Sequence, residues 1–288
     1  MPNSPLVPTV RRRRLGSTLR HFRHQAGLTL EEAAEVMGWK APKLSKIENA
    51  TQSIRPSEVT QLLKAYGQHE TEVSSALEGL ARDAGKRGWW QTYRGVLVPT
   101  YTDYISLEED AESIRAYAPG AIPGLLQTVA YARETIAATT NRTPEEVLSL
   151  AEVRQARQVV LSRSENPVHL WAIIHEAVLH QRFAIKPVIM REQLRNLLHV
   201  SNLPNVTIQV MPLSSTPHPG SAGPFSLIRF RGPVPAVVVL ENLIGATYIE
   251  DAHGVKSYTT AYERIVAAAL SPDDSLALIA HLEKGKRT

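Results

Sequence analysis

Short amphipathic helices that end at single glycines fill the first quarter of the chain, and this spacing restricts the fold more than any other feature. The segment over residues 15–26 carries one apolar stripe at helical spacing and is followed by Gly27, which suits the left-handed position after a helix. A second stripe ends at Gly38 and a later one ends at Gly67. With a further helix expected over residues 69–84, the pattern predicts a compact helical domain.

The second and third of these helices carry start signals of their own. Thr29 precedes Glu32 by three residues, which is the spacing of a capping box. Pro42 fits the first turn of the third helix, where a missing N–H group costs nothing. A brief glycine-containing turn therefore separates two helices with defined starts.

The third helix lies in the stretch GWKAPKLSKIEN, and it has one apolar side and one cationic side. Leu44 and Ile47 are three residues apart on the first side, and Lys43 and Lys46 are three residues apart on the second. Lys40 stands just ahead of the helix. Two short helices joined in this way form a helix-turn-helix, whose second helix enters the major groove of DNA. Lysines there reach guanine acceptors or phosphates.

The distribution of charge agrees with this interpretation. Residues 1–98 hold 15 Lys and Arg against 9 Asp and Glu, whereas residues 99–288 hold 17 against 19. A basic end on a nearly neutral body is what a nucleic-acid-binding domain attached to a separate domain would show. On charge alone, a basic surface without a partner is the alternative.

Residues 15–67 resemble the helix-turn-helix domain of the Xre family, which includes the lambda repressor and Cro proteins. The resemblance rests on the segments LTLEEAAEVMG, LSKIENA and RPSEVTQLLKAYG. It implies a mainly α, five-helix domain that binds a double-stranded DNA operator, with Glu48 as a structural residue that holds the domain together. Ala50 stands where glycine is usual, so we expect a slightly different turn after the recognition helix.

The resemblance also assigns residues to DNA contact, position by position. The assigned residues within the matched segments are Thr29, Lys40, Ala41, Pro42, Lys43, Ser45, Lys46 and Asn49. Of these, Ala41, Pro42 and Lys46 fall on base-reading positions and Thr29 on a phosphate contact. The alternatives are a merely solvated surface for the lysines and a helix-starting role alone for Pro42.

Five arginines are further candidates for contact with the DNA backbone: Arg11, Arg12, Arg13, Arg14 and Arg55. The first four belong to a basic N-terminal tail, residues 1–14, which is either disordered or runs as an arm along the DNA. Arg55 either touches a phosphate or simply precedes a proline. The helix-turn-helix domain itself is expected over residues 15–85.

The remainder of the chain is predicted to form an α+β domain over residues 100–285, reached through a linker over residues 86–99. The runs VTIQVMP, FSLIRF and AVVVLE are β-branched and aromatic and are separated by Pro/Gly loops, which is typical of strands. The stretch DYISLEEDAESIRAYAPG is expected to be one helix, residues 103–120. A long C-terminal helix is expected to break at Pro272.

Four acidic residues of the expected helix would give one of its faces a strongly negative charge: Glu108, Glu109, Asp110 and Glu112. This face is either simply solvated or helps to receive a small regulatory protein. In the second case, apolar residues near the segment IPGLLQT would complete the docking surface.

Several segments resemble motifs of enzymes or metal sites, but each lacks a residue or a spacing that the motif requires. The chain has no cysteine, which excludes disulfides, thiol catalysis and cysteine-based zinc sites and fits a reducing compartment. His175 and His180 are five residues apart, whereas a zinc-protease helix needs four. The loop HPGSAGPF lacks the Lys-Ser/Thr of a phosphate-binding loop. We therefore expect no enzyme, no cofactor and no metal.

The N-terminal segment has no apolar core of a secretory signal, and no run approaches the 18 or so apolar residues of a membrane span. A cytoplasmic, nucleoid-associated protein without a membrane partner is the expectation.

Most of residues 100–282 are similar to the effector region of WhiJ-like, antitoxin-like regulators of actinobacteria, through segments such as AYAPGAIPGLLQTVAYAR, PNVTIQVMP and AALSPDDSLALI. The resemblance implies a transcriptional regulator paired with a small BldB-like or toxin-like protein. We expect a sequence-specific DNA-binding regulator whose second domain dimerises or receives such a partner. The alternatives are an antitoxin that neutralises a small partner and a regulator that senses a small metabolite.

Overall fold

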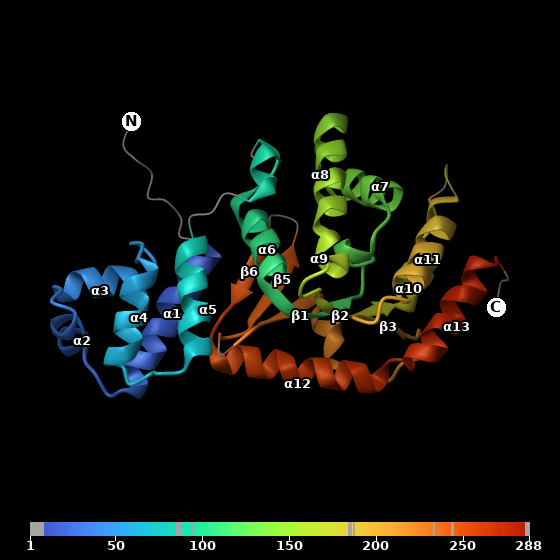
Figure 1. Ribbon diagram of the computed structural model, residues 1–288. Coiled ribbons are helices and arrows are strands. Elements are labelled where there is room, and N and C mark those ends of the chain that lie inside the picture. Colours follow the sequence, from blue (N-terminus) through green and yellow to red (C-terminus); the bar gives the residue numbers. More distant parts are fainter. Residues whose placement is uncertain are drawn as a thin grey trace. The chain divides into compact units, whose positions relative to one another are not determined.

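The computed structural model describes residues 9–84, 88–93, 95–183, 186, 188–232, 234–242 and 245–285. Contacts along the chain divide it into two compact units. The first reaches to Trp89 and includes residues 230–235, and the second comprises residues 90–229 and 236–288. Figure 1 shows a helical bundle in the first unit and a sheet with helices in the second.

Over its described residues, the first unit contains five helices: α1 (Val10–Gln25), α2 (Leu30–Val36), α3 (Ala41–Glu48), α4 (Pro56–Ala65) and α5 (Thr71–Asp83). Each contributes buried apolar side chains to one core, among them Leu19, Ala33, Leu44, Leu62 and Leu77. Because each helix is short, its stability comes from this shared core rather than from helix propensity. The predicted five-helix domain is confirmed.

The turns between these helices use left-handed backbone. Gly27, Gly38 and Gly67 have φ angles of 70°, 64° and 74°, as the sequence predicts for residues just after a helix. Ala50, which follows α3, has φ of 60°. The alanine therefore takes the backbone conformation that favours glycine, at a cost of about 1–2 kcal/mol, and the turn expected to differ keeps the left-handed form.

The helices of the second unit, within the described residues, are α6 (Pro99–Asp110), α7 (Val129–Thr139), α8 (Pro144–Arg157), α9 (Val159–Ser162), α10 (Glu176–Leu179), α11 (Val188–Val200), α12 (Ala252–Ala268) and α13 (Pro272–Glu283). The strands are β1 (Ala111–Ala118), β2 (His169–His175), β3 (Val206–Met211), β4 (Phe225–Phe230), β5 (Val237–Asn242) and β6 (Gly245–Ile249). Short 3-10 helices occupy Trp89–Tyr93, Gly124–Leu126 and Pro219–Ala222.

The strands form a mixed sheet in the order β3-β2-β1-β4-β5-β6. β1 pairs with β2 and β2 with β3 in parallel, whereas β4, β5 and β6 pair antiparallel. The predicted α+β class is confirmed.

Side chains alternate between the two faces of this sheet. One face carries Ile173, Leu227 and Val238, which pack with Tyr262 and Ile265 of α12. Figure 1 shows α12 along that side and α6 to α8 on the opposite side. The period of two therefore assigns the intervening residues of each strand to the face covered by α6 and α8.

The continuous helix expected over residues 103–120 is wrong in its second half. The helix ends at Asp110, and the next eight residues form β1. Ile114 and Ala116 are buried on one face of the strand, and β1 lies between β2 and β4 in the sheet. Pairing on both edges outweighs the helix propensity of the alanines and glutamate in this segment.

Candidate nucleic-acid interface

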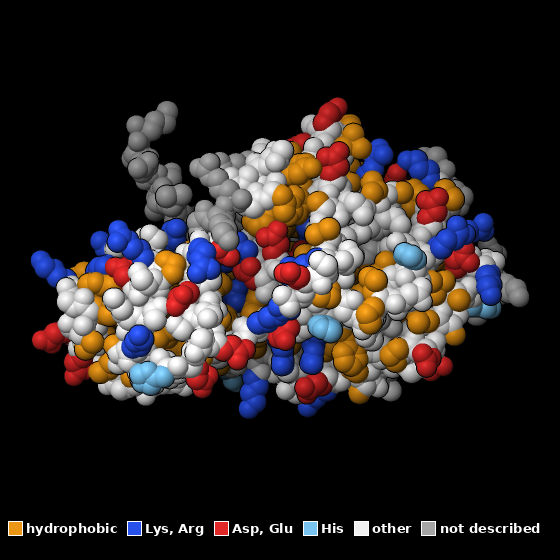
Figure 2. All heavy atoms as spheres, viewed as in Figure 1, with side chains coloured by type: hydrophobic (Ala, Val, Ile, Leu, Met, Phe, Trp, Pro, Cys, Tyr) orange, Lys and Arg blue, Asp and Glu red, His pale blue; other side chains and the backbone are white. Residues whose placement is uncertain are grey.

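Helix α3 is anchored by its apolar side and exposes the other. Leu44 and Ile47 are buried in the helical core, whereas Pro42 and Lys46 are exposed. Ala41 begins the helix and is half-buried. Figure 2 shows Lys and Arg side chains gathered along α3, while Asp and Glu side chains lie beside α2. The amphipathic helix predicted from the sequence is therefore present, with its polar side available to a ligand.

The C-terminal end of α3 is held by a buried ion pair. Glu48 accepts two hydrogen bonds from Arg23 of α1, at 2.7 Å from Nε and 3.0 Å from Nη2. Arg23 also donates to the carbonyl of Leu28 at 2.8 Å, and Arg20 lies 3.4 Å from Glu48. The Glu48 side chain is only 2% exposed. These contacts bear out the structural role that the resemblance implied for Glu48.

A close backbone approach supports the same junction. A Cβ atom added at Gly16 of α1 would lie 2.6 Å from the carbonyl oxygen of Glu48. Real Cβ contacts do not come so near, so only glycine allows α1 to lie against the end of α3. The sequence pattern did not single out Gly16, because the stripe of α1 reads the same with alanine in its place.

The two lysines of α3 differ in how firmly they are held. Lys43 donates to Glu58 at 3.0 Å, and its ammonium lies 3.5 Å from the ring centroid of Trp39. Lys46 is exposed and has no ion pair among the described residues. A contact of Lys43 with DNA would have to replace two existing interactions, whereas Lys46 is free to reach a base or a phosphate.

Asn49 is the residue that follows α3, and its side-chain amide donates to the hydroxyl of Ser45, one turn earlier, at 3.3 Å. Asn49 also accepts from Arg20 Nη2 at 2.5 Å. Lys40 is the exposed residue that precedes the helix. Ser45 and Lys46 therefore lie on α3, Lys40 and Asn49 are the residues that flank it, and Asn49 is linked to the ion-pair network through Arg20.

Thr29 and Arg55 lie at the starts of neighbouring helices. The Thr29 hydroxyl caps α2, accepting from the Glu32 amide at 3.2 Å and donating to its carboxylate at 2.8 Å. The Thr29 amide also donates to that carboxylate, at 2.8 Å, and this bond is the main cause of a lowered pKa at Glu32. Arg55 is exposed and precedes α4. Thr29 thus has its predicted capping role.

The arginine-rich segment is not a tail from residue 11 onward. Helix α1 begins at Val10, so Arg11, Arg12, Arg13 and Arg14 are all helical. Arg11 and Arg14 are 7% and 2% exposed. A buried guanidinium cannot lie along a phosphate backbone, so the expected arm is wrong for these two residues, and Arg12 and Arg13 are half-buried. Residues 1–8 lie outside the described part of the chain.

The acidic face expected near residue 108 is also wrong. Glu108 is 1% exposed and makes a bidentate ion pair with Arg157 of α8, at 2.6 Å and 2.7 Å. Glu112 lies in β1 rather than in the helix. The docking surface expected beside it fails for the same reason, because Ile122, Leu125 and Leu126 of the segment IPGLLQT are buried.

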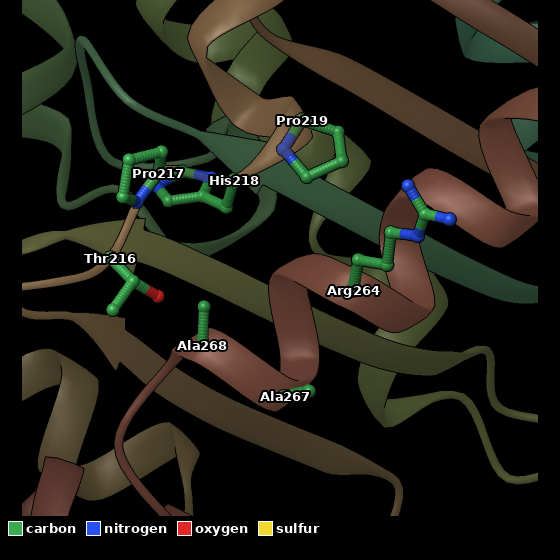
Figure 3. Close-up of a pocket in the computed structure, with 7 residues that line it drawn as sticks. All are labelled: Thr216, Pro217, His218, Pro219, Arg264, Ala267 and Ala268. Carbon is green, nitrogen blue, oxygen red and sulfur yellow. The ribbon is translucent and has the colours of Figure 1, made fainter.

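The loop HPGSAGPF lines a shallow pocket on the side of α12. Figure 3 shows Thr216, Pro217, His218 and Pro219 on one side of it and Arg264, Ala267 and Ala268 of α12 on the other. The His218 ring accepts from the amide of Gly220 at 3.1 Å and meets Tyr117 edge-on. His175 likewise caps α10. These two histidines therefore have structural roles, and no cluster of three metal-ligating side chains occurs in the described residues.

Among the residues that the structure describes, no single helix is long and apolar enough to cross a membrane. Helices α12 and α13 meet that test only as a pair, across a bend of 63°.

Comparison with known proteins gives two family matches. Residues 14–76 match a helix-turn-helix domain, which supports a DNA-binding regulator, a class that is typically not enzymatic. Residues 101–281 match a domain of unknown function, DUF5753. No curated protein and no solved structure gives a significant match. Because the second match covers more than half of the chain, the chain belongs to the DUF5753 family and carries a helix-turn-helix domain ahead of its family domain.

Proposed function

We propose that this protein is a sequence-specific transcriptional regulator of the Xre type that inserts α3 into the major groove of an operator. The observation that carries the proposal is the exposed polar side of α3, with Lys46 at its centre, on a helix fixed by the buried Glu48. A recognition helix needs this combination, because base contacts require side chains on a rigid support. The candidate DNA contacts are Thr29, Lys40, Ala41, Pro42, Lys43, Ser45, Lys46, Asn49 and Arg55.

The test has two stages. The full chain first selects its preferred sequences from a random duplex library, and the enriched duplex then serves in gel-shift titrations at fixed salt. Lys46→Ala should weaken specific binding about 5- to 150-fold, which corresponds to about 1–3 kcal/mol for a lost base contact. Lys64→Ala removes an exposed lysine from α4 and should leave the affinity unchanged. Enrichment of no sequence, or equal effects of the two variants, would refute the proposal.

The protein is further proposed to bind as a homodimer. One short recognition helix buries little DNA surface, and domains of this kind usually occupy two half-sites about one helical turn, roughly 34 Å, apart. Selected sequences should therefore contain an inverted repeat, and light scattering should give twice the mass of one chain. A monomer both free and on DNA would contradict this.

A small protein partner, as in the WhiJ-like group, has only the resemblance of the second domain as support, because the docking surface expected for it is buried. The antitoxin alternative shares this weakness. The metabolite alternative, in contrast, gains a specific observation from the cavity described next.

A further inference from the structure

A cavity of about 480 Å³ lies on the face of the sheet opposite α12. Its lining comes from α6, α7, α8 and the strands β1, β2, β4 and β5, together with residues 120–125 and Gln127, and all of these belong to the second unit. Pockets for small organic molecules range from about 300 to 1,000 Å³. The cavity is therefore large enough for a ligand of modest size.

Much of the wall is apolar, and the strand pattern explains why. Ile114 and Ala116 of β1 and Leu170 of β2 lie on one face, where Ile114 pairs directly with Leu170 in the parallel register. Val239 of β5 lies on the same wall, two residues before Glu241. Period-two alternation gives Val239 and Glu241 the same side of the sheet. The alternation thus places the carboxylate of Glu241 beside the apolar residues of this wall.

Two of the four charged residues that line the cavity neutralise each other. Glu108 and Arg157 form the bidentate pair described above, and Arg157 also donates to the hydroxyl of Tyr101. Their side chains are 2% and 4% exposed. This pair needs no further counter-ion.

Glu241 is different. It has no ion pair among the described residues, and its side chain keeps accessible surface although it lines the cavity. The surrounding protein nevertheless removes enough water to raise its pKa, with Glu108 adding repulsion and Arg157 and Arg154 opposing the shift. A cation bound in the cavity would stabilise the ionised form of such a carboxylate.

Arg154 is the other charged residue of the cavity lining that makes no ion pair with the described residues. Its Nη1 donates to Gln127 at 2.7 Å and to Thr135 at 3.5 Å, whereas its Nε and Nη2 make no hydrogen bond to the described residues. Arg154 and Gln127 both line the cavity. They can therefore donate hydrogen bonds to an oxygen acceptor on a ligand.

We propose that this cavity binds a small organic amine: a molecule with an apolar body, an ammonium group that pairs with Glu241, and an oxygen that accepts from Arg154. The apolar wall buries the body, and the two charged residues orient it. The site lies within the second unit, and its occupancy does not depend on whether the first unit binds DNA.

Three test compounds of one size distinguish the charge that the site prefers. Tyramine carries an ammonium group, tyrosol carries a hydroxyl in its place, and 3-(4-hydroxyphenyl)propanoate carries a carboxylate. In ligand-observed NMR titrations of the full chain near neutral pH, tyramine should bind at least tenfold more tightly than tyrosol, and the propanoate more weakly than either. The proposal is overturned if the propanoate binds as tightly as tyramine, or if none of the three binds at millimolar concentration.

Matched variants assign the binding to this site. Glu241→Gln should weaken tyramine binding at least tenfold while leaving tyrosol unchanged, because only the ion pair is lost. Glu263→Gln removes an exposed carboxylate from α12, on the other side of the sheet, and should have no effect. Ala118→Leu adds bulk at the cavity wall and should weaken all binding. Circular dichroism and thermal melts verify that each variant folds, and tyramine binding unaltered by Glu241→Gln refutes the assignment.

Discussion

Each of the two units contains a buried arginine–glutamate pair, and the two pairs have different surroundings. In the helix-turn-helix domain, Arg23 is bound to Glu48 and to the Leu28 carbonyl, so its partners belong to a closed core. In the DUF5753 domain, Arg157 is bound to Glu108 at the edge of a cavity that also holds Glu241 and Arg154. The same chemistry therefore fixes a helix in one place and borders a candidate ligand site in the other.

The two pairs differ in how many carboxylates interact with the arginine. The Glu48 carboxylate is contacted by both Arg23 and Arg20, and neither arginine forms an ion pair with another carboxylate of the described residues. Arg157, in contrast, interacts electrostatically with both Glu108 and Glu241. A pair in a closed core has nothing to replace a lost partner, whereas a pair beside an unpaired carboxylate does.

The largest effect is expected for Glu48→Ala. Removing one partner of a buried ion pair leaves the other charge uncompensated and costs about 3–5 kcal/mol. We expect the helix-turn-helix domain to lose most of its stability and α3 its position, with loss of specific DNA binding. Hydrogen-exchange mass spectrometry of the full chain should show lost protection in residues 10–83 and retained protection in residues 100–285. Glu31→Ala, at an exposed position of α2, should leave both unchanged.

Glu108→Ala is expected to cost less, about 1–3 kcal/mol, because Glu241 remains to balance Arg157. The measurement is urea unfolding combined with hydrogen exchange of residues 100–285. The double variant Glu108→Ala with Glu241→Gln should bring the loss up to the level of Glu48→Ala. If Glu108→Ala alone lowers the free energy of unfolding as much as Glu48→Ala does, Glu241 does not compensate the charge of Arg157. The two pairs then do not differ in the way described.

Glu241→Gln should change the pH dependence of stability. The native pKa of Glu241 is raised by burial, so native Glu241 ionises less readily than in the unfolded chain, and the wild type loses stability as pH rises above the ordinary glutamate value. The glutamine variant lacks this loss, so its stability relative to wild type should be greater at about pH 7.5 than at about pH 4.

The groups that face Glu241 set the controls for this experiment. Glu108 of α6 repels it, Arg154 and Arg157 of α8 attract it, and Tyr104 of α6 donates a hydrogen bond. Urea titrations at the two pH values, with Glu263→Gln as the matched variant outside the cavity, isolate the Glu241 carboxylate. A difference from wild type that stays constant between the two pH values would show that desolvation in the cavity does not hold back the ionisation of Glu241.

The sequence predicts the helical domain almost completely, because its signals are local. Thr29 and Glu32 form the predicted capping box of α2. Local signals act in the second unit too, where Thr143 and Glu146 form a capping box at the start of α8. The break at Pro272 is also present. Caps, glycines and apolar stripes act over one or two turns, so a single sequence contains all the information that they need.

Long-range contacts account for what the sequence did not predict. β1 is a strand because β2 and β4 flank it, and β6 is a short strand that pairs with β5. Glu108 and Arg157 meet across 49 positions of the chain, a distance at which no periodicity links them. One local signal for the cavity existed: Glu241 ends the apolar run AVVVL in register with Val239. Alternation predicts its side of the sheet, but not that a cavity lies there.

The smallest effect is expected for Ala50→Gly, next to the ion pair of the helix-turn-helix domain. Ala50 has φ of 60°, and release of this left-handed conformation by glycine gains about 1–2 kcal/mol. The Ala50 side chain is 2% exposed, so loss of its buried methyl group costs about 0.8 kcal/mol, and the greater flexibility of glycine in the unfolded chain costs about 0.4–1 kcal/mol. The terms nearly cancel, and thermal unfolding should shift the stability of the domain by less than about 1 kcal/mol. Because the Glu48–Arg23 pair, rather than the turn, fixes the end of α3, affinity for the selected duplex should also persist. A large loss of affinity in Ala50→Gly with normal stability would instead make this turn, and not the buried pair, the feature that positions the recognition helix.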